Sequence, residues 1–391
     1  MKIASRIRKG LGLLIILLHI TGCLSTVDNQ QNIAKERIQS TLDSLVLDND
    51  IPGLNFSIIY MDGIQENYSS GFANVKKQIP LTAEHVMFSG SVGKTYAVAV
   101  LMQMVEEGKL NLNDKFIDYF PEVEWLRGLP NIDDITIKML LSHTSGLPRY
   151  VMKDEVWSSM KNDPDKVWSY EDRLSLICGD TAVHAPGEGW AYSDSNYILL
   201  GMLIEKLSND YYYDEVSDRL LDPLGLHSTY AAVRRDIENL PVGYSKLPEM
   251  FAIPPEVVVE GKFIFNPQME WTGGGFASTT PDLASWAGFY YHGGIISDTL
   301  LVAMTTPSEQ GRNLDETTSY GMGSFIYVTT HGPAYGHTGF MPGFNTIFAW
   351  FPEQEMAVAL QANCDYAANK MGLINYVDEI VTVVLSDTGS R

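Results

Sequence analysis

The sequence predicts an α+β fold, in which an antiparallel β-sheet is flanked by N- and C-terminal helices and interrupted by a mostly helical insertion. Three observations support this prediction. A helix and two strands come first after a leader, helical patterns dominate the middle of the chain, and several short strands and a helix close it. Since the strand-rich ends are separated by the helical part, we expect both ends to build one sheet domain.

The first elements are an amphipathic helix and a pair of strands. Apolar residues recur at helical spacing over 33–46. The runs 54–60 and 65–73 have the composition of strands, and Asp62-Gly63 between them is typical of a tight turn. These segments predict a helix that leads into a β-hairpin.

A second helix is predicted to begin near Ser91. Its apolar residues recur at helical spacing up to Val105, and Gly108 ends the pattern. The following part, about 110–265, has mostly helical signals with long Pro- and Gly-containing loops.

The last part of the chain returns to strands. Thr280-Pro281 is typical of a helix cap with proline in the first turn, and this helix is expected to run through Trp286. Short strands and one final helix complete the prediction: strands at 323–330, 334–340, 346–351 and 356–361, and a helix at about 371–385.

These elements predict how the chain is divided. Residues 32–109 and 266–391 are expected to form the α/β sheet domain, and residues 110–265 the mostly helical domain. We expect an active site between the two.

Residues 1–22 predict a lipoprotein signal peptide. Four basic residues precede an apolar run over 11–20, which is too short to span a bilayer. The run ends near Thr21-Gly22-Cys23, which is similar to a bacterial lipoprotein box. We therefore expect Cys23 to be lipidated after cleavage and residues 23–31 to form a tether; a plain signal peptide with a chance cysteine is the alternative. The predicted location is extracytoplasmic and membrane-anchored, on the periplasmic side or the cell surface.

The charge balance argues against polyanionic partners. The chain has 27 Lys and Arg against 48 Asp and Glu, a net charge of −21. The only charged residues that cleavage of the leader would remove are basic, so the mature chain would be more negative still. Nucleic acid and anionic head groups would repel such a surface, so we expect no nucleic-acid partner and membrane attachment through lipid alone.

No metal or cofactor is expected. The sequence lacks a His-Glu-x-x-His motif, paired-cysteine motifs and an Asp-rich calcium loop. Cys178 and Cys364 are the only cysteines beyond Cys23. We expect them to be buried free thiols.

Ser91 and Lys94 form the first candidate catalytic pair. On a helix, residues three apart share a face, so the two side chains are expected to point the same way. A lysine ammonium favours the serine alkoxide, and an unprotonated lysine amine takes the serine proton; either role suits acyl transfer. The alternative is a helix-capping serine beside an exposed lysine.

The sequence does not fit two other patterns, the phosphate-binding loop of nucleotide-binding proteins and the nucleophile elbow of α/β-hydrolases. Gly93-Lys94-Thr95 copies the end of a phosphate-binding loop, but Phe88 stands where that loop needs its first glycine. No Gly-x-Ser-x-Gly elbow occurs, which disfavours an α/β-hydrolase. Ser158 and Lys161 repeat the Ser-x-x-Lys spacing in a polar stretch, which we interpret as chance.

Two later stretches supply partners for Ser91. Tyr192 lies on a loop that leads into an apolar helix. The segment Gly336-His337-Thr338-Gly339-Phe340 is a glycine-interrupted strand, where missing side chains allow a substrate to approach the backbone.

With these motifs the chain resembles the serine β-lactamase and penicillin-binding protein superfamily, nearest its class C and esterase-like branch. The resemblance covers about residues 33–385 and keeps the family order. Its motifs are Ser91-Val92-Gly93-Lys94, Tyr192-Ser193-Asp194 and His337-Thr338-Gly339, and its intervening elements are 140–148, 222–226 and 274–279.

The resemblance implies a β-lactamase/transpeptidase-like fold and an acyl-enzyme on Ser91. Lys94 and Tyr192 would share the proton, and the backbone N–H groups of Ser91 and Phe340 would form the oxyanion hole. His337 would place a hydrogen-bond donor on the opposite wall. Thr338 and Gly339 complete the implied substrate-binding strand.

Two residues depart from the family pattern. Asp194 stands where the second motif commonly has Asn, and it adds a charge beside the lysine. His337 stands where β-lactamases usually have Lys, and a part-time cation is a weaker partner for a β-lactam carboxylate.

Both departures favour an esterase or a D,D-peptidase-like enzyme over a β-lactamase. We therefore predict an extracytoplasmic serine hydrolase that acts on a small-molecule or peptide substrate, either an ester or a D-amino-acid-type amide. β-Lactam hydrolysis is the first alternative. A non-catalytic, surface-anchored penicillin-binding or sensor protein is the alternative of another class, and Asp194 is the residue that favours it.

Overall fold

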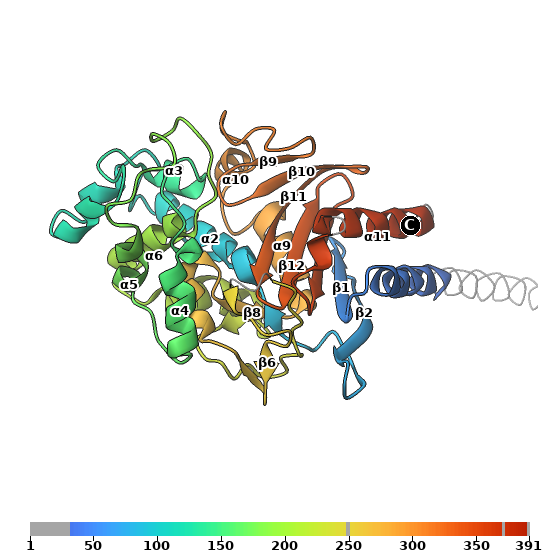
Figure 1. The fold of residues 1–391 in the computed structure, drawn as a ribbon. Helices are drawn as coiled ribbons and strands as arrows, with labels where there is room; N and C mark the ends of the chain where they lie inside the picture. Colours follow the sequence, from blue (N-terminus) through green and yellow to red (C-terminus); the bar gives the residue numbers. More distant parts are fainter. Residues whose placement is uncertain (1–31, 248–250, 370–371, 389–391) are drawn as a thin grey trace, which may run out of the picture.

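The protein, seen in a computed structural model that describes residues 32–247, 251–369 and 372–388, contains an eight-stranded antiparallel sheet. Its strand order is β3-β2-β1-β13-β12-β11-β10-β9 (Figure 1). The predicted α+β class and antiparallel sheet are confirmed. The strands are β1 (Gly53–Tyr60), β2 (Gln65–Asn74), β3 (Ile79–Pro80), β9 (Thr318–Tyr320), β10 (Phe325–Thr329), β11 (Gly332–Met341), β12 (Phe344–Phe351) and β13 (Met356–Ala362).

The two ends of the chain meet in the middle of this sheet. Strand β1 pairs with β13, and Phe56 lies opposite Leu360. Strands β1 and β2 form the predicted hairpin, whose turn is closed by a 2.9 Å hydrogen bond from the Gly63 N–H to the Tyr60 carbonyl. The sheet therefore joins segments about 300 residues apart, as the order of elements predicted.

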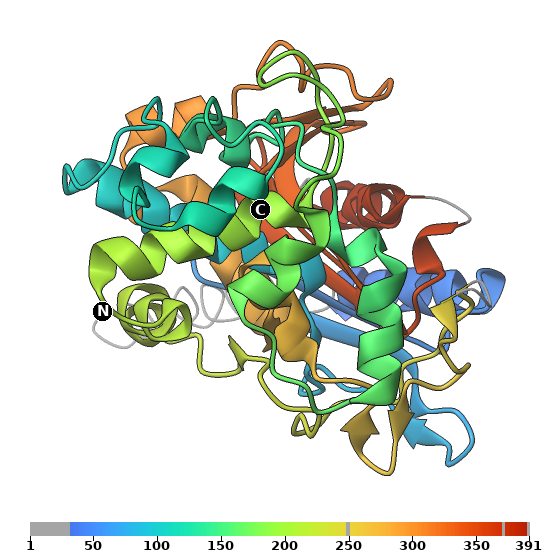
Figure 2. The same cartoon turned by 60° about the vertical axis from the view of Figure 1, so that its left-hand side comes forward.

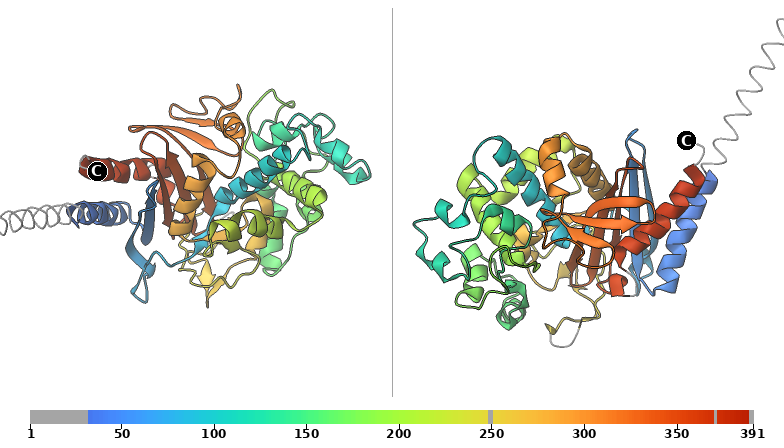
Figure 3. Two further views of the ribbon diagram at one scale, coloured as in Figure 1. Left: turned by 180° about the vertical axis from the view of Figure 1, so that it is seen from behind. Right: turned by 90° about the horizontal axis from the view of Figure 1, so that it is seen from above.

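Helices cover both faces of the sheet. The helix at residues 32–48 and α11 (Leu373–Thr388) lie side by side on one face, and α9 (Thr280–His292) lies on the other (Figure 3). Successive side chains of a strand point to opposite faces, so Val358 joins the core under the terminal helices and Ala359 the core under α9. Since both faces are covered, every residue of β13 is buried.

The start of α9 differs by one residue from the expectation. The capping residue is Thr279, not Thr280, because the Thr279 side chain accepts a hydrogen bond from the Asp282 N–H at 3.4 Å. Pro281 then lies in the first turn, where its missing N–H is not needed.

The remaining helices gather beside the sheet, where Figure 2 brings them to the front. They are α2 (Lys94–Glu106), α3 (Ile137–Leu141), α4 (Asp154–Asn162), α5 (Tyr170–Leu174), α6 (Asp194–Ser208), α7 (Tyr212–Val216), α8 (Asp222–Leu224) and α10 (Asp298–Met304). Small strands join them: β4 (Met87–Phe88), β5 (Tyr230–Ala231) and β8 (Phe276–Ser278) form one sheet, and β6 (Val258–Val259) pairs with β7 (Lys262–Phe263).

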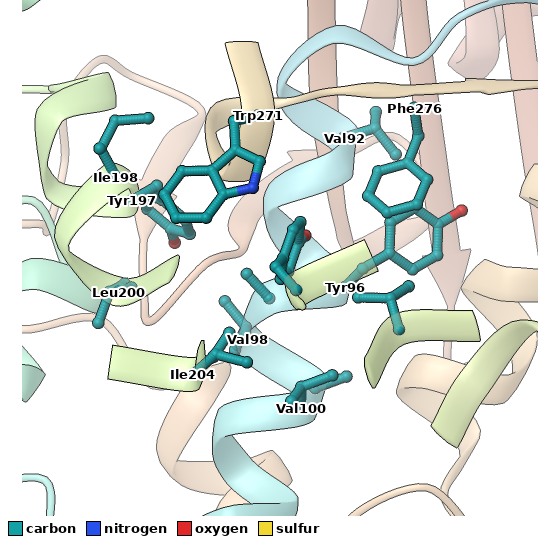
Figure 4. Close-up of a cluster of buried hydrophobic side chains, with 14 of the residues drawn as sticks. Val92, Tyr96, Val98, Val100, Tyr197, Ile198, Leu200, Ile204, Trp271 and Phe276 are labelled. Atoms are coloured by element: carbon teal, nitrogen blue, oxygen red, sulfur yellow. The ribbon is translucent and has the colours of Figure 1, made fainter. Parts of the chain in front are cut away.

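The core beside the sheet is built on α2 and α6. Tyr96 packs on Phe276 with the ring centroids 4.7 Å apart, and Tyr197 of α6 lies in the same cluster near Trp271 (Figure 4). Both helices are buried along most of their length, which agrees with apolar residues on all sides of each helix. This packing fixes the first residues of α2 and α6 relative to each other, and those residues carry the candidate site.

Candidate active site

Ser91 and Lys94 lie where a short 3₁₀ helix, η1 (Gly90–Gly93), passes into α2. A 3₁₀ helix has three residues per turn, so side chains three positions apart lie above one another. The Lys94 Nζ atom accordingly donates a hydrogen bond to the Ser91 Oγ atom at 2.9 Å. The two residues predicted to act together are therefore in contact.

Lys94 is fully buried and makes two further polar contacts. Its Nζ atom donates to the Asp194 Oδ1 atom at 2.8 Å and to the Gly273 carbonyl. Gly273 ends the 3₁₀ helix η8 (Pro267–Gly273). Burial disfavours the charged lysine, but Asp194 and Tyr192 together outweigh burial and raise the Lys94 pKa. Lys94 is therefore an ammonium in the resting enzyme.

Asp194, the first residue of α6, connects Lys94 to a second cation. Its Oδ2 atom accepts hydrogen bonds from the Arg149 Nε atom at 3.0 Å and the Nη2 atom at 2.8 Å. Burial raises the pKa of this carboxyl, but Lys94 and Arg149 outweigh burial and hold the Asp194 pKa well below its ordinary value. The sequence placed Asp194 beside the lysine, and the structure shows that contact.

Tyr192 lies on the loop before α6, with its hydroxyl buried. The Lys94 Nζ atom is 5.0 Å from the centre of the Tyr192 ring, and the His143 ring is 4.2 Å away on centroids. Burial raises the Tyr192 pKa, and Lys94 and the Ser91 hydroxyl offset part of this rise. Tyr192 is thus a phenol whose ionised form Lys94 stabilises.

Strand β11 places the third motif against η1. Gly90 has φ +50°, and a Cβ atom there would collide with the backbone N of Phe340. Likewise a Cβ atom on Gly339 would collide with the Ser89 carbonyl oxygen. The two glycines allow η1, which holds Ser91, and β11, which holds Phe340, to lie close together, as an oxyanion hole between them would need.

His337 is fully buried, and its side chain does not line the cavity in front of Ser91. Its Nδ1 atom is 2.6 Å from the Thr338 carbonyl, and its Nε2 atom is 3.3 Å from the Tyr320 hydroxyl. Burial, with a smaller effect of Lys94, lowers the His337 pKa to about 3, so the ring is neutral. The structure places this ring beside Tyr192, with centroids 6.3 Å apart. A direct contact of His337 with substrate stays a prediction.

A cavity of about 330 Å³ opens in front of Ser91. Its charged lining residues are Arg149, Asp194 and Glu270. Much of the lining is apolar and partly aromatic, with residues that include Trp157, Phe251, Phe265, Met269 and Phe340. The lining comes from both the 110–265 segment and the segments on either side of it.

Arg149 and Glu270 were missed by sequence reasoning. Arg149 follows the Leu147-Pro148 end of a family element, which is a weak signal because one arginine in a loop has many possible roles. Glu270 precedes the Gly273-Gly274-Gly275 run. Nothing in that run indicates a carboxyl group in the cavity.

The remaining predicted residues have mixed outcomes. Thr338 is half-buried on β11, and Cys23 lies outside the described residues. Cys178 and Cys364 are free thiols, but only Cys364 is buried, so full burial of Cys178 was a wrong expectation.

No group of three or more His, Cys, Asp or Glu side chains among the residues that the structure describes is arranged to hold a metal ion. No helix within the same described ranges has both the length and the apolar character needed to cross a membrane.

Known sequences resemble this chain over most of its length. Penicillin-binding protein 4* of Bacillus subtilis (strain 168) is 26% identical over 323 residues, which is 79% of this chain and 68% of that protein. Protein flp of Staphylococcus aureus (strain MW2) is 25% identical over 338 residues, which is 85% of this chain and 64% of that protein. The chain thus spans about two thirds of the length of these curated relatives.

Solved structures share the fold. A D-amino acid amidase from Ochrobactrum anthropi SV3, complexed with L-phenylalanine amide, superimposes with a TM-score of 0.76 at 22% identity, covering 91% of this chain and 99% of that one. A D-stereospecific amidohydrolase from Streptomyces sp. has a TM-score of 0.75 at 24% identity, covering 86% and 96%.

The family assignment rests on the sequence match. The sequence model of the family described as Beta-lactamase matches residues 32–381, which include all three motifs. This chain therefore belongs to the beta-lactamase family, and it is a serine hydrolase of the superfamily that contains the serine β-lactamases and the penicillin-binding proteins.

Proposed function

We propose that this protein hydrolyses an ester or a D-amino-acid-type amide through an acyl-enzyme on Ser91. The observation that carries the proposal is the Ser91 hydroxyl, 2.9 Å from the Lys94 ammonium, in the lining of a largely apolar cavity. The names of the similar structures, a D-amino acid amidase and a D-stereospecific amidohydrolase, agree with a carbonyl substrate of this kind.

In the first step, the Ser91 oxygen attacks the substrate carbonyl carbon. Lys94 is charged, so it does not accept the Ser91 proton; instead it stabilises negative charge on its neighbours. The ionised form of Tyr192 accepts that proton as the new C–O bond forms. Negative charge then moves to the carbonyl oxygen, which the backbone N–H groups of Ser91 and Phe340 would bind.

Collapse of this intermediate breaks the bond to the leaving group. Tyr192 returns its proton to the leaving amine or alcohol, which leaves an acyl group on Ser91. A water molecule then attacks the acyl carbon, Tyr192 accepts the water proton, and Ser91 leaves with that proton. The same groups therefore serve both halves of the reaction, as microscopic reversibility requires.

The neutral state of His337 supports an ester or amide over a β-lactam. A permanent cation on β11 would bind the carboxylate of a β-lactam, and a buried neutral imidazole does not supply that charge. Arg149, the cation that does line the cavity, already shares its charge with Asp194.

Labelling tests the nucleophile. We expect a fluorescent acyl phosphonate to label the wild-type protein and Ser91→Ala to abolish labelling, because the alanine has no oxygen to acylate. Ser158→Ala is the matched control, since Ser158 has the same Ser-x-x-Lys spacing and is an exposed residue of α4. Undiminished labelling of Ser91→Ala would place the nucleophile elsewhere.

Turnover needs a separate measurement. A panel of a short-chain aryl ester, a D-Ala-D-Ala peptide and a chromogenic β-lactam should show the ester or the peptide turned over faster than the β-lactam. Intact mass reports on deacylation after a single addition of substrate. An adduct that never clears would support the non-catalytic sensor instead.

We also propose that the protein is exported and anchored to a membrane by a lipid on Cys23. The basic and apolar leader and the Thr21-Gly22-Cys23 ending support this proposal. In such a location, the substrate would come from outside the cytoplasm.

A further inference from the structure

Glu270 is a carboxyl group in the cavity with no countercharge in contact. It lines the cavity together with Ser91, and its one hydrogen bond is from the Gly275 N–H to Oε2 at 3.2 Å. Among the residues that the structure describes, no Lys, Arg or His side chain forms an ion pair with Glu270. Asp194 in the same cavity differs, because both of its oxygens bind cations.

The backbone around Glu270 is shaped to place the carboxyl there. Trp271, the next residue, has φ +44°, a conformation that is uncommon for a bulky side chain. A Cβ atom on Gly274 would collide with the Glu270 carboxylate. The missing side chain at 274 thus allows the carboxylate to fold back beside the loop that binds Lys94.

The charged and titratable groups facing Glu270 come from several elements. They are Lys94 of α2, Asp194 of α6, Tyr213 of α7 and Tyr150, and Arg149 lines the same cavity. Lys94 favours the ionised carboxylate and Asp194 disfavours it. Burial has the largest effect and raises the Glu270 pKa to about 7. A half-buried carboxylate without a countercharge gains free energy when a cationic ligand enters the cavity.

We propose that Glu270 is a specificity-determining residue that binds the ammonium group of the substrate, which is an amino-acyl ester or amide with a free amine and an apolar side chain. This inference rests on the proposed function. The ammonium would lie near Glu270 while the scissile carbonyl lies at Ser91, since both residues line one cavity. The aromatic lining residues, among them Trp157 and Phe251 with ring centroids 5.0 Å apart, would contact the apolar side chain of the substrate.

Two substrates that differ only in the amine test this role. They are D-phenylalanine 4-nitroanilide and 3-phenylpropionic acid 4-nitroanilide. For Glu270→Gln we expect kcat/KM on the amino substrate to fall about 10- to 100-fold, the value of a charge-assisted hydrogen bond. We expect less than a threefold change on the substrate without the amine. Equal losses on both substrates, or no loss on the amino substrate, would overturn the proposal.

Glu205→Gln is the matched control. Glu205 is also a half-buried carboxyl with a pKa raised by burial, and it accepts one backbone hydrogen bond, from the Tyr212 N–H at 3.0 Å. It does not line the cavity in front of Ser91. This variant should leave kcat/KM unchanged on both substrates.

A binding measurement on the wild-type protein keeps the proposal testable if Glu270→Gln does not fold or if neither nitroanilide is turned over. Phenethylamine stays charged between pH 5 and 9, because alkylamines have a pKa of about 10. Its affinity by calorimetry should fall as the pH drops below about 7 and Glu270 is protonated, while 2-phenylethanol should show no such change. An affinity for phenethylamine that does not depend on pH would overturn the proposal. If the acyl phosphonate does not label Ser91 of the wild-type protein while phenethylamine still binds in this pH-dependent way, the proposed function alone is contradicted.

Discussion

At the scale of single residues, the site depends on a row of alternating charges. Lys94, Asp194 and Arg149 follow one another at hydrogen-bond distance, with Ser91 at one end. The carboxylate at 194, where the family commonly has an amide, keeps the lysine charged. The proton acceptor that we propose is Tyr192, whose pKa is raised. Activity should therefore increase as the pH rises.

We predict that Asp194→Asn shifts the pH profile toward lower pH. Removing the carboxylate removes the attraction that raises the Lys94 pKa, and it also removes a charge that raises the Tyr192 pKa. With both pKa values lower, a larger fraction of each group is deprotonated at a given pH. The acidic limb of kcat/KM for an aryl ester should move down by about one pH unit or more.

The control for this shift is Asp114→Asn. The Asp114 pKa is also lowered, chiefly by the Tyr119 hydroxyl, which donates to it at 2.6 Å, but this carboxylate does not line the cavity. Its profile should match that of the wild type. An Asp194→Asn profile that stays in place or moves to higher pH would show that Asp194 does not control the proton acceptor.

At the scale of elements, the site needs three backbones in close contact. The η1 turn touches β11 through Gly90 and Gly339, and it touches the end of η8 through Gly93. Each contact has a glycine where any side chain would collide with a backbone atom. The close approach brings the Gly273 carbonyl to Lys94 and the Phe340 backbone to Ser91.

We predict that Gly93→Ala destabilises the protein and removes Ser91 labelling. The new Cβ atom would collide with the Gly274 carbonyl oxygen, so η1 and η8 must move apart. Overpacking of this kind costs about 1–3 kcal/mol, or more where the backbone must shift. Urea denaturation would measure the loss, and the acyl phosphonate would report the displacement of Ser91 from Lys94.

Gly288→Ala supplies the comparison. Gly288 lies within α9, and a Cβ atom there would have an ordinary 3.5 Å contact with the Met61 side chain. Alanine favours the helix over glycine by about 1 kcal/mol, so this variant should be as stable as the wild type or more stable. Equal stability of Gly93→Ala and Gly288→Ala would contradict the role given to the η1–η8 contact.

At the scale of the whole molecule, charge and location are connected. The net charge of −21 repels anionic head groups, so a lipid on Cys23 would have to supply the membrane attachment. We predict that the wild-type protein incorporates labelled palmitate and sediments with membranes in a bacterial host. Cys23→Ser should lose the label and leave the membrane fraction. Cys178→Ser should keep both, and membrane attachment of Cys23→Ser without label would contradict the lipid anchor.

The sequence alone determined the features that are written in short local patterns. The spacing of Ser91 and Lys94, the order of the three motifs and the strand-rich ends were enough to predict the sheet, its flanking helices and the family. A helix or strand repeats its apolar side chains at a fixed period, so the pattern is visible without the partner on which it packs.

Only the tertiary structure decided which charges meet. Arg149 lies in a loop and Glu270 in the short 3₁₀ helix η8; both are distant in sequence from Ser91, and no apolar period marks them. Their contribution depends on burial, on countercharges and on glycines that let backbones touch, all of which arise when the segments pack. The same packing makes His337 a neutral, buried neighbour of Tyr192, because pKa and exposure are properties of the assembled surroundings.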